Sequence, residues 1–322
     1  MYFDPVIGRS NPRGPNIQHV VSSFILNKGV EILNRIIKYM YLLSLILLFV
    51  TGCSSSSNKP ATALDNKIKD TPQETQSIRI AGSGSNIPLT QKILDEYAKK
   101  SGVHINIPVS IGTIGAVKAL QDNQLELGLI SRELKDSEKQ SGLKQKSYGK
   151  IGIVFGVHGK VPDDNIGSED LLNIYKGTKT TWSNGKNIIV LAREIGDSSN
   201  SALEKSLPSF KNVLDEALNS KRWDIYYTDQ EANDAIVTIP NSFGITDTVA
   251  IKMQTQIKPL KFNGVEATLD NIQNQSYPFN KNLYFAYKEP LSAQTKHFLD
   301  FVYSDEGQAI ISNNGGLPLK GE

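Results

Sequence analysis

The chain contains very little cysteine and histidine. Its 322 residues include one cysteine, Cys53, and four histidines, which are scattered without a spacing such as H-x-x-x-H. A single cysteine excludes an internal disulfide and a cysteine-built metal site, and scattered histidines give no zinc-ligand pattern. We therefore expect no bound metal and no cofactor.

The chain also lacks an excess of charge of either sign and an apolar run of membrane-spanning length. Lys and Arg number 35 and Asp and Glu 33, a net charge of +2, so composition gives no case for nucleic-acid binding. The apolar segment Tyr41–Val50 is about ten residues long, and a spanning helix needs about 20. Its length fits the apolar core of a signal peptide.

The segment after this apolar run resembles a bacterial lipobox, in which a cysteine is acylated and becomes the new N-terminus. It reads Val50-Thr-Gly-Cys53 and is followed by four serines. We predict that residues 1–52 are a leader and lipoprotein signal peptide, and that Cys53 carries the lipid, palmitate included. Residues 53–76 are polar and predict a flexible tether. The alternative is a signal anchor that keeps its apolar run.

From Ser77 onward the apolar pattern alternates between strand and helix periods, which predicts an α/β fold. The continuous apolar run at 151–158 predicts a central strand. We expect strands at 78–81, 103–109, 127–130, 151–158, 187–192, 235–239, 243–246 and 283–287, and helices at 89–100, 116–121, 168–176, 202–206, 208–219 and 293–312.

Small polar residues or arginine follow four of these strands. They form the turns Gly82–Asn86, Ser110–Thr113, Ser131-Arg132 and Arg193–Ser201. Strands of an open α/β sheet bind ligands at their carboxyl ends, and helix N-termini and arginine both attract anions. Together the four turns predict an oxyanion pocket. Each turn alone would also fit an ordinary capped turn, and each arginine a surface ion pair.

In order, these pieces resemble the phosphate-type substrate-binding proteins of bacterial ABC importers. The resemblance runs from Ile78 to Leu319 and includes AGSGSN, IGTIGAVKAL, LGLISREL, REIGDSSNSALE and SFGIT, and its most specific part is the tail that begins at Tyr277. It implies a two-lobed periplasmic-binding-protein type II fold with two crossovers and a central anion cleft. Lobe 1 would hold 77–155 plus 272–320, and lobe 2 would hold 156–271.

The resemblance also implies which residues bind the anion. Thr113 stands where the family commonly has serine, and Asp197 stands where it usually has a hydroxyl. Asp197 has two interpretations: it accepts the proton of hydrogen phosphate, or it caps the helix that begins near Ser199. The implied ligand residues are Ser85, Asn86, Ile87, Thr113, Ser131, Arg132, Arg193, Asp197, Ser198 and Ser199.

The function that the resemblance implies is a non-enzymatic, extracytoplasmic receptor, lipid-anchored to the cell membrane. It would bind inorganic phosphate as a monomer and deliver it to ABC transporter permease subunits. Three alternatives stay open at this point. The same fold could bind sulfate or molybdate, it could serve signalling or adhesion as a phosphate sensor, or the chain could be a serine hydrolase. A hydrolase would use Ser198 as nucleophile, with His158 or His297 as base.

Overall fold

The computed structural model describes residues 77–320, and the predicted signal peptide, Cys53 and the whole tether lie outside that range. The strands are β1 (Ile80–Gly82), β2 (Leu127–Ile130), β3 (Lys144–His158), β4 (Asn165–Ile166), β5 (Ile189–Arg193), β6 (Asp224–Tyr226), β7 (Ser242–Asp247), β8 (Ile257–Pro259), β9 (Lys261–Phe262), β10 (Asn280–Tyr287) and β11 (Leu317–Pro318). The helices are α2 (Ile87–Ser101), α3 (Gly112–Gln121), α4 (Asp136–Gln140), α5 (Ser168–Lys176), α6 (Ser198–Ser206), α7 (Ser209–Asn219), α8 (Asp229–Thr238), α9 (Thr248–Met253), α10 (Leu269–Gln273), α11 (Ala293–Tyr303) and α12 (Asp305–Asn313).

A mixed sheet runs through this part of the chain, with the strand order β1-β2-β10-β3-β7-β5-β6. Strand β1 is parallel to β2, and β5 is parallel to both β6 and β7. The long strand β3 is antiparallel to β10 and to β7. The central strand predicted at 151–158 is confirmed, because β3 has neighbours on both sides and is buried over most of its length.

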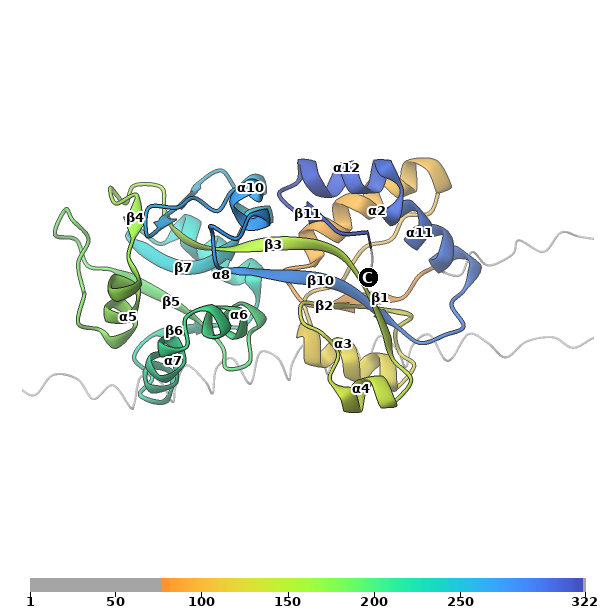
Figure 1. Cartoon of the computed structure of the whole chain (residues 1–322), viewed down its shortest axis with the longest axis horizontal. Helices are drawn as coiled ribbons and strands as arrows, with labels where there is room; N and C mark the ends of the chain where they lie inside the picture. The colour runs from red at the N-terminus through yellow and green to blue at the C-terminus, as the bar shows by residue number, and fades with distance from the viewer. Residues whose placement is uncertain (1–76, 321–322) are drawn as a thin grey trace, which may run out of the picture. The chain divides into compact units, whose positions relative to one another are not determined.

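Apolar side chains form two main cores, and strands β3 and β10 run side by side from one to the other (Figure 1). Along β3, Ile151 packs in one core and Ile153 in the other. Where the chain crosses back, Phe279 packs in the core of Ile153 and Leu283 of β10 packs in the core of Ile151. The two cores define the two lobes, called lobe 1 (with Ile151) and lobe 2 (with Ile153). The predicted lobe bounds stay a prediction. Core packing favours a second crossover, from lobe 2 back to lobe 1, that lies later in the chain than residue 272.

Local signals place the helices that the sequence predicts most clearly. Helix α2 has Pro88 in its first turn, buries Leu89 and Ile93, and ends at Gly102, which has the left-handed φ of 70°. Helix α5 ends in the same way at Gly177, with φ of 77°. Within residues 77–320, no helix combines the length and hydrophobicity that a membrane crossing requires.

The strand predicted at 103–109 is wrong, because a side chain takes the place of its neighbour strand. The Gln91 amide donates to the Ile105 carbonyl at 2.9 Å, and its oxygen accepts from the Ile107 N–H at 3.0 Å. Backbone groups that are already paired need no sheet partner. The segment therefore stays irregular and lies along α2.

The strand predicted at 235–239 is also wrong, because residues 235–238 belong to α8. Thr228 and Glu231 form a capping box, with both hydrogen bonds at 3.1 Å. Ala232 and Ile236 are buried at helical spacing behind it. This start signal decides the conformation of the whole segment.

The single helix predicted at 293–312 is divided at Ser304. The Ser304 hydroxyl oxygen accepts from the Gly307 N–H at 3.2 Å and caps a new helix, α12. An extended backbone at Ser304, with ψ of 162°, separates it from α11. The apolar period continues through the break, and this is why the sequence pattern does not reveal it.

Candidate functional site

A cavity of about 410 Å³ lies where parallel strands of both lobes end. Its lining comes from the segments that follow β1, β2, β5 and β6, and from the start of α3. The carboxyl ends of strands are the usual place for a ligand in an open α/β sheet. The lining residues are Ser83, Gly84, Ser110, Ile111, Gly112, Thr113, Ile114, Arg132, Lys135, Arg193, Glu194, Ile195, Gly196, Asp197, Ser198, Ser201, Tyr227 and Asp229.

A buried hydrogen-bond network holds the lobe 1 side of the cavity. Asn86 donates to the Ser131 hydroxyl at 2.6 Å and accepts from the Tyr148 hydroxyl at 2.8 Å. The Ser131 hydroxyl donates to Ser83 at 2.8 Å, and the Ser131 N–H donates to the Thr113 hydroxyl at 3.1 Å. The turns after β1 and β2 are thereby held against each other. A fully paired buried network of this kind is rigid.

The start of α3 lines this side of the cavity, and α2 begins at Ile87, three residues after the lining residue Gly84. Helix α2 begins after Asn86 and α3 begins after Ile111, and neither of these two residues makes a side-chain capping bond, although the Gly112 N–H donates to the Ser110 hydroxyl at 3.2 Å. The first N–H groups of a helix have no partner within the helix, and the helix dipole adds partial positive charge there. The Ile87 N–H bonds to the Gly84 carbonyl at 3.2 Å, while the cavity is lined by Gly112, Thr113 and Ile114 of α3.

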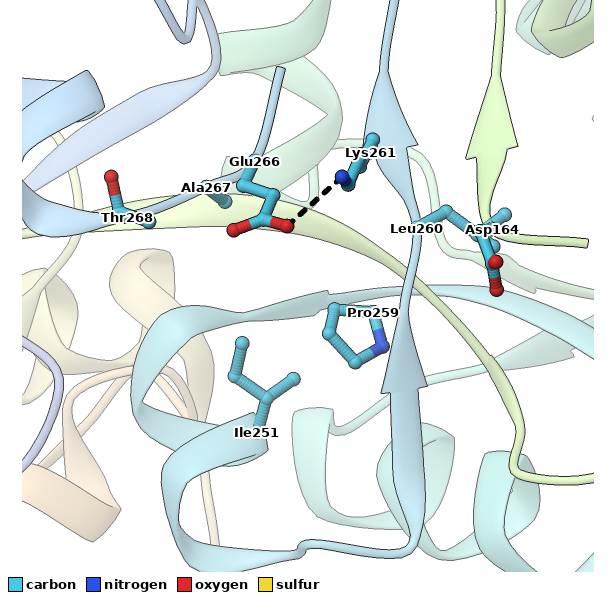
Figure 2. A pocket seen from close by; sticks show the side chains of 8 residues that line it. All are labelled: Asp164, Ile251, Pro259, Leu260, Lys261, Glu266, Ala267 and Thr268. Carbon is cyan, nitrogen blue, oxygen red and sulfur yellow. Dashed lines mark ion pairs between the residues drawn. The ribbon is translucent and has the colours of Figure 1, made fainter. Parts of the chain in front are cut away.

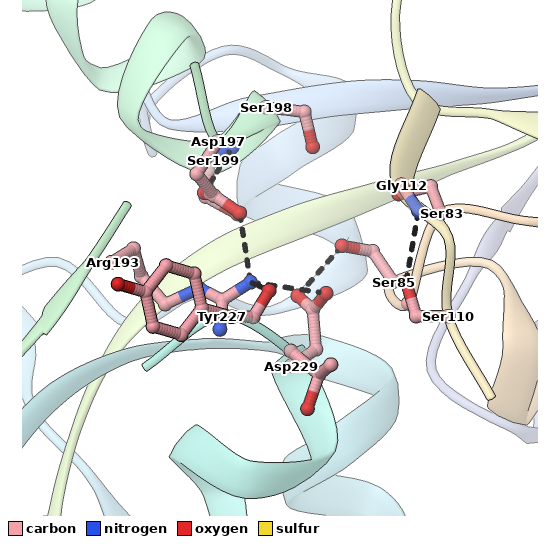
Figure 3. A network of polar contacts seen from close by, with 12 residues as sticks. Ser83, Ser85, Ser110, Gly112, Arg193, Asp197, Ser198, Ser199, Tyr227 and Asp229 are labelled. Atoms are coloured by element: carbon pink, nitrogen blue, oxygen red, sulfur yellow. Dashed lines mark hydrogen bonds and ion pairs between the residues drawn. The ribbon is translucent and has the colours of Figure 1, made fainter. Parts of the chain in front are cut away.

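Arg193 is the cation at the lobe 2 side of the cavity (Figure 3). It is 3% exposed, and its guanidinium donates to Asp197 at 2.9 Å, to Asp229 at 3.4 Å and to the Tyr226 carbonyl at 3.1 Å. Burial opposes the charge of Arg193, but Asp229 and Asp197 outweigh it and raise the pKa of the guanidinium. Arg193 is therefore fully ionised beside the cavity.

Asp197 makes the contacts that the capping interpretation predicts. Its Oδ1 accepts from the Ser199 N–H at 2.9 Å and the Asn200 N–H at 3.3 Å, and α6 begins there. Burial opposes ionisation of Asp197, but the charges of Arg193 and Lys281 outweigh it and lower the pKa of the carboxyl. Its role as acceptor of a phosphate proton stays a prediction.

Arg132 lines the cavity, but its guanidinium is bound in lobe 1. It donates two hydrogen bonds to the Glu138 carboxylate, at 2.8 and 2.7 Å. The hydrogen bond from Arg132 is the main reason why the pKa of Glu138 is lowered. The bidentate pair holds the guanidinium at the edge of the cavity.

The remaining predicted residues lie behind the lining. Thr113, Arg132, Arg193, Asp197 and Ser198 line the cavity itself. Of the others, Ser85, Ser131 and Ser199 are buried and hydrogen-bond to lining residues, the buried Asn86 hydrogen-bonds to Ser131, and Ile87 is the first residue of α2. The structure thus gathers the predicted residues of both lobes in one place, and their role in binding stays a prediction.

The charged residues that the sequence argument missed include Asp229 and Lys281, besides Lys135 and Glu194 of the lining. Asp229 follows the short strand β6 and accepts from the Ser85 hydroxyl at 2.9 Å. Lys281 lies at the start of β10 and donates to Ser85, Ser198 and Ser199 at 2.7, 2.9 and 2.8 Å. The capping box after Thr228 was a usable signal for Asp229. Lys281 gave no clear signal, because it lies between Asn280 and Asn282 at the polar start of β10.

No histidine bonds to the Ser198 hydroxyl among residues 77–320, where its recorded partner is Lys281. His158 accepts from the Lys160 N–H at the end of β3 instead. The arrangement of nucleophile and base that a serine hydrolase needs is therefore not formed by the histidines that the sequence offered.

A second hollow, of about 480 Å³, lies in lobe 2 away from these residues (Figure 2). Its lining includes Lys261, Glu266 and Asp164. Lys261 pairs with Glu266 at 3.1 Å, and Asp164 pairs with Lys258. Its lining residues all lie between 164 and 268, whereas the cavity described above is lined by residues of both lobes.

Comparisons with known proteins agree with the fold. Phosphate-binding protein PstS 2 of Streptococcus agalactiae is 30% identical over 122 residues, which are 37% of this chain and 41% of that protein. The chain thus matches less than half the length of that relative. Phosphate-binding protein PstS of Borreliella burgdorferi is 22% identical over 264 residues, 76% of this chain and 90% of that protein.

Solved structures extend the likeness over the described residues. A Clostridium perfringens protein assigned to phosphate ABC transport, crystallised with bound phosphate, is 27% identical with a TM-score of 0.67, covering 76% of this chain and 100% of that one. An ABC-type phosphate transport receptor of Vibrio cholerae shares the fold at 19% identity and a TM-score of 0.52, covering 75% and 99%. The two-lobed fold is thereby confirmed. A family model described as a PBP superfamily domain matches residues 68–306, and the chain belongs to this superfamily.

Proposed function

We propose that the chain is an extracytoplasmic receptor that binds inorganic phosphate in the cavity between its lobes and delivers it to the permease of an ABC importer. The names of its relatives support this ligand, and the similar Clostridium perfringens structure holds phosphate. The role is binding without catalysis.

One observation carries the proposal: anion-binding groups of both lobes meet at a single cavity. Lobe 1 contributes the start of α3, and lobe 2 contributes Arg193 and the first turn of α6. Helix N-termini and a buried guanidinium are groups that bind phosphate oxygens from fixed directions. Because the groups come from two lobes, the anion would be enclosed when the lobes close, and hydrogen bonds to it would strengthen as water leaves.

Calorimetry of the full-length protein in detergent tests the ligand. Phosphate, sulfate and molybdate are titrated in parallel at constant ionic strength, because exposed charges are screened by salt. We expect phosphate to bind with the highest affinity and sulfate to bind at least tenfold more weakly. Tighter binding of sulfate or molybdate would assign the same cavity to another oxyanion, and no heat with any of the three would reject the proposal.

Arg193→Lys is the matched variant for this titration, because it keeps the charge and loses the planar pair of donors. Loss of a partner of a buried charged ligand costs on the order of 2–5 kcal/mol, and we expect the Lys variant to lie near the lower end of this range. Affinity for phosphate should therefore fall by roughly 30-fold or more. An affinity within about threefold of the parent protein would place Arg193 outside the binding site.

The anchor and the permease complete the proposal. A lipid on Cys53 would hold the receptor at the outer side of the cell membrane, and the polar residues up to 76 would let it move beside its transporter. Labelling with a palmitate analogue tests the anchor, and co-purification with a permease complex from the same cells tests delivery. A protein that binds phosphate but copurifies with no permease would instead serve as a sensor.

A further inference from the structure

We propose that Lys281 is a positioning residue that ties the two lobes together and orients the Ser198 hydroxyl toward the bound anion. The tie between the lobes stands on its own, while the orientation of this hydroxyl toward an anion rests on the proposed function. Lys281 itself does not line the cavity, so it would act through the serines that it contacts.

The three donors of the Lys281 ammonium are all used, and they go to both sides of the cleft. One hydrogen bond reaches Ser85, in the turn before α2 of lobe 1. The other two reach Ser198 and Ser199, in the first turn of α6 of lobe 2. An ammonium has three N–H donors, so this set leaves none over. A single side chain on a connecting strand thus holds the two anion-facing turns at a fixed separation.

These contacts also decide where the hydroxyl hydrogens point. A serine oxygen that accepts from an ammonium must direct its own hydrogen elsewhere. The Ser85 hydrogen goes to Asp229, at an oxygen–oxygen distance of 2.9 Å. Ser198 lines the cavity, and no acceptor for its hydrogen is recorded among residues 77–320. An anion oxygen in the cavity would supply that acceptor.

The charge of Lys281 is buried without a direct carboxylate partner. Lys281 is 6% exposed, and it forms no ion pair within the part of the chain that the structure describes. A buried ammonium without a counter-charge is strongly unfavourable, and hydroxyl groups offset this only in part. Asp197 and Asp247 act on it through space, as the lowering effect of Lys281 on the pKa of each carboxyl indicates. A bound anion would add the missing negative charge close by.

The rival explanation is that Lys281 only balances these buried carboxylates. Lys281→Met removes the ammonium and keeps an unbranched apolar chain, and Lys281→Arg keeps the charge. Lys150→Met is the matched control, because Lys150 lies on β3 directly opposite Asn282 and lines a different hollow. Lys281→Gln replaces the Met variant if that variant does not fold.

The first measurement needs no ligand and tests the tie between the lobes. Spin labels are placed by Lys99→Cys in lobe 1 and Lys211→Cys in lobe 2, in full-length protein carrying Cys53→Ser. Without any anion, Lys281→Met should widen the distribution of distances between the labels. Lys150→Met should leave this distribution unchanged, and the width of the distribution in Lys281→Arg should lie between those of the parent protein and Lys281→Met. An unchanged distribution in Lys281→Met overturns the tie, whatever the ligand of the protein is.

The second measurement is phosphate calorimetry of the same variants. We expect Lys281→Met to weaken phosphate binding by roughly 10- to 100-fold, because hydrogen bonds to charged groups are being lost. Lys281→Arg should recover part of this loss, which a purely structural defect would not show. If the parent protein binds phosphate and Lys281→Met binds it within threefold, the positioning role is wrong. If the parent binds no phosphate, the proposed function fails, and the label distances still decide the role of Lys281 between the lobes.

Discussion

Ser85 and Asp229 join the two lobes directly: the Ser85 hydroxyl donates to the Asp229 carboxylate at 2.9 Å (Figure 3). Beside this bond, the Gln230 amide donates to the Gly84 carbonyl at 3.2 Å. The same Asp229 carboxylate also pairs with Arg193 at 3.4 Å. An anion that enters the cavity would therefore have to share Arg193 with Asp229, so the lobe contact and the binding site are coupled.

We predict that Asp229→Asn reduces the preference for phosphate over sulfate. Hydrogen phosphate has a proton that a carboxylate can accept, and sulfate has none, so a carboxylate that faces the anion disfavours sulfate. Asp229 suits this role better than Asp197, because its side chain is 17% exposed against 7%, and because Asp197 Oδ1 already takes two backbone N–H groups. Titration of each variant with both anions measures the preference.

Asp197→Asn is the matched control for this experiment, since an amide oxygen can still cap α6. We expect the ratio of phosphate to sulfate affinity to fall at least tenfold in Asp229→Asn and to change little in Asp197→Asn. The reverse pattern would assign the acceptor role to Asp197, the other interpretation that the sequence allowed.

Gly84→Ala should weaken phosphate binding by keeping the lobes apart. A Cβ at Gly84 would lie 2.4 Å from Asp229 Oδ2, closer than real Cβ contacts. The backbone of Gly84 is not left-handed, so alanine adds no local strain and the fold should keep its unfolding temperature. Gly167→Ala is the control, because its Cβ would meet nothing closer than 3.7 Å. Equal phosphate affinity of the two variants in calorimetry would argue against closure at this point.

Asp247→Asn should stabilise the protein at pH 8 and have little effect near pH 4. Asp247 caps α9, and burial raises the pKa of its carboxyl to about 6 from 3.8. Between these two values the folded state holds a proton that the unfolded state has released, so stability falls as the pH rises through this window. Above pH 6 the resulting decrease in the free energy of unfolding is constant, at up to ~3 kcal/mol. Asparagine caps the helix without this charge.

Thermal unfolding at pH 4, 6 and 8 measures the effect, with Asp197→Asn as a control of opposite sign. The pKa of Asp197 is lowered in the folded state, so its charge stabilises the folded state at pH values above the pKa that it has in the unfolded chain. Asp197→Asn should therefore be less stable than the parent at pH 8. A constant difference between Asp247→Asn and the parent at all three pH values would refute the assignment.

Cys53→Ser should abolish acylation and leave an uncleaved precursor. The prediction rests on the lipobox-like Val50-Thr-Gly-Cys53 sequence, which lies outside the described residues. Metabolic labelling with a palmitate analogue and the apparent mass of the product measure both effects. Labelling that persists in the serine variant would show that the lipid is attached elsewhere.

Local sequence signals were sufficient for the elements whose stability is local. Strand β2 has the predicted bounds, 127–130, and helix α5 has the predicted bounds, 168–176, because a short apolar run and a left-handed glycine leave few alternatives. The turn with Asn86 and the turn with Arg193 and Ser198 were predicted for the same reason, since each turn follows a strand. Their residue types predict an anion pocket even before their positions in space are known.

Tertiary structure decided what depends on residues far apart in the chain. Residues 103–109 are not a strand because Gln91 of a packed helix takes their hydrogen bonds. Asp229 and Lys281 became part of the site through bonds to Ser85 across 144 and 196 residues. Each such bond forms only because the order of the strands in the sheet brings the ends of distant strands to one cleft, and no local pattern encodes that order.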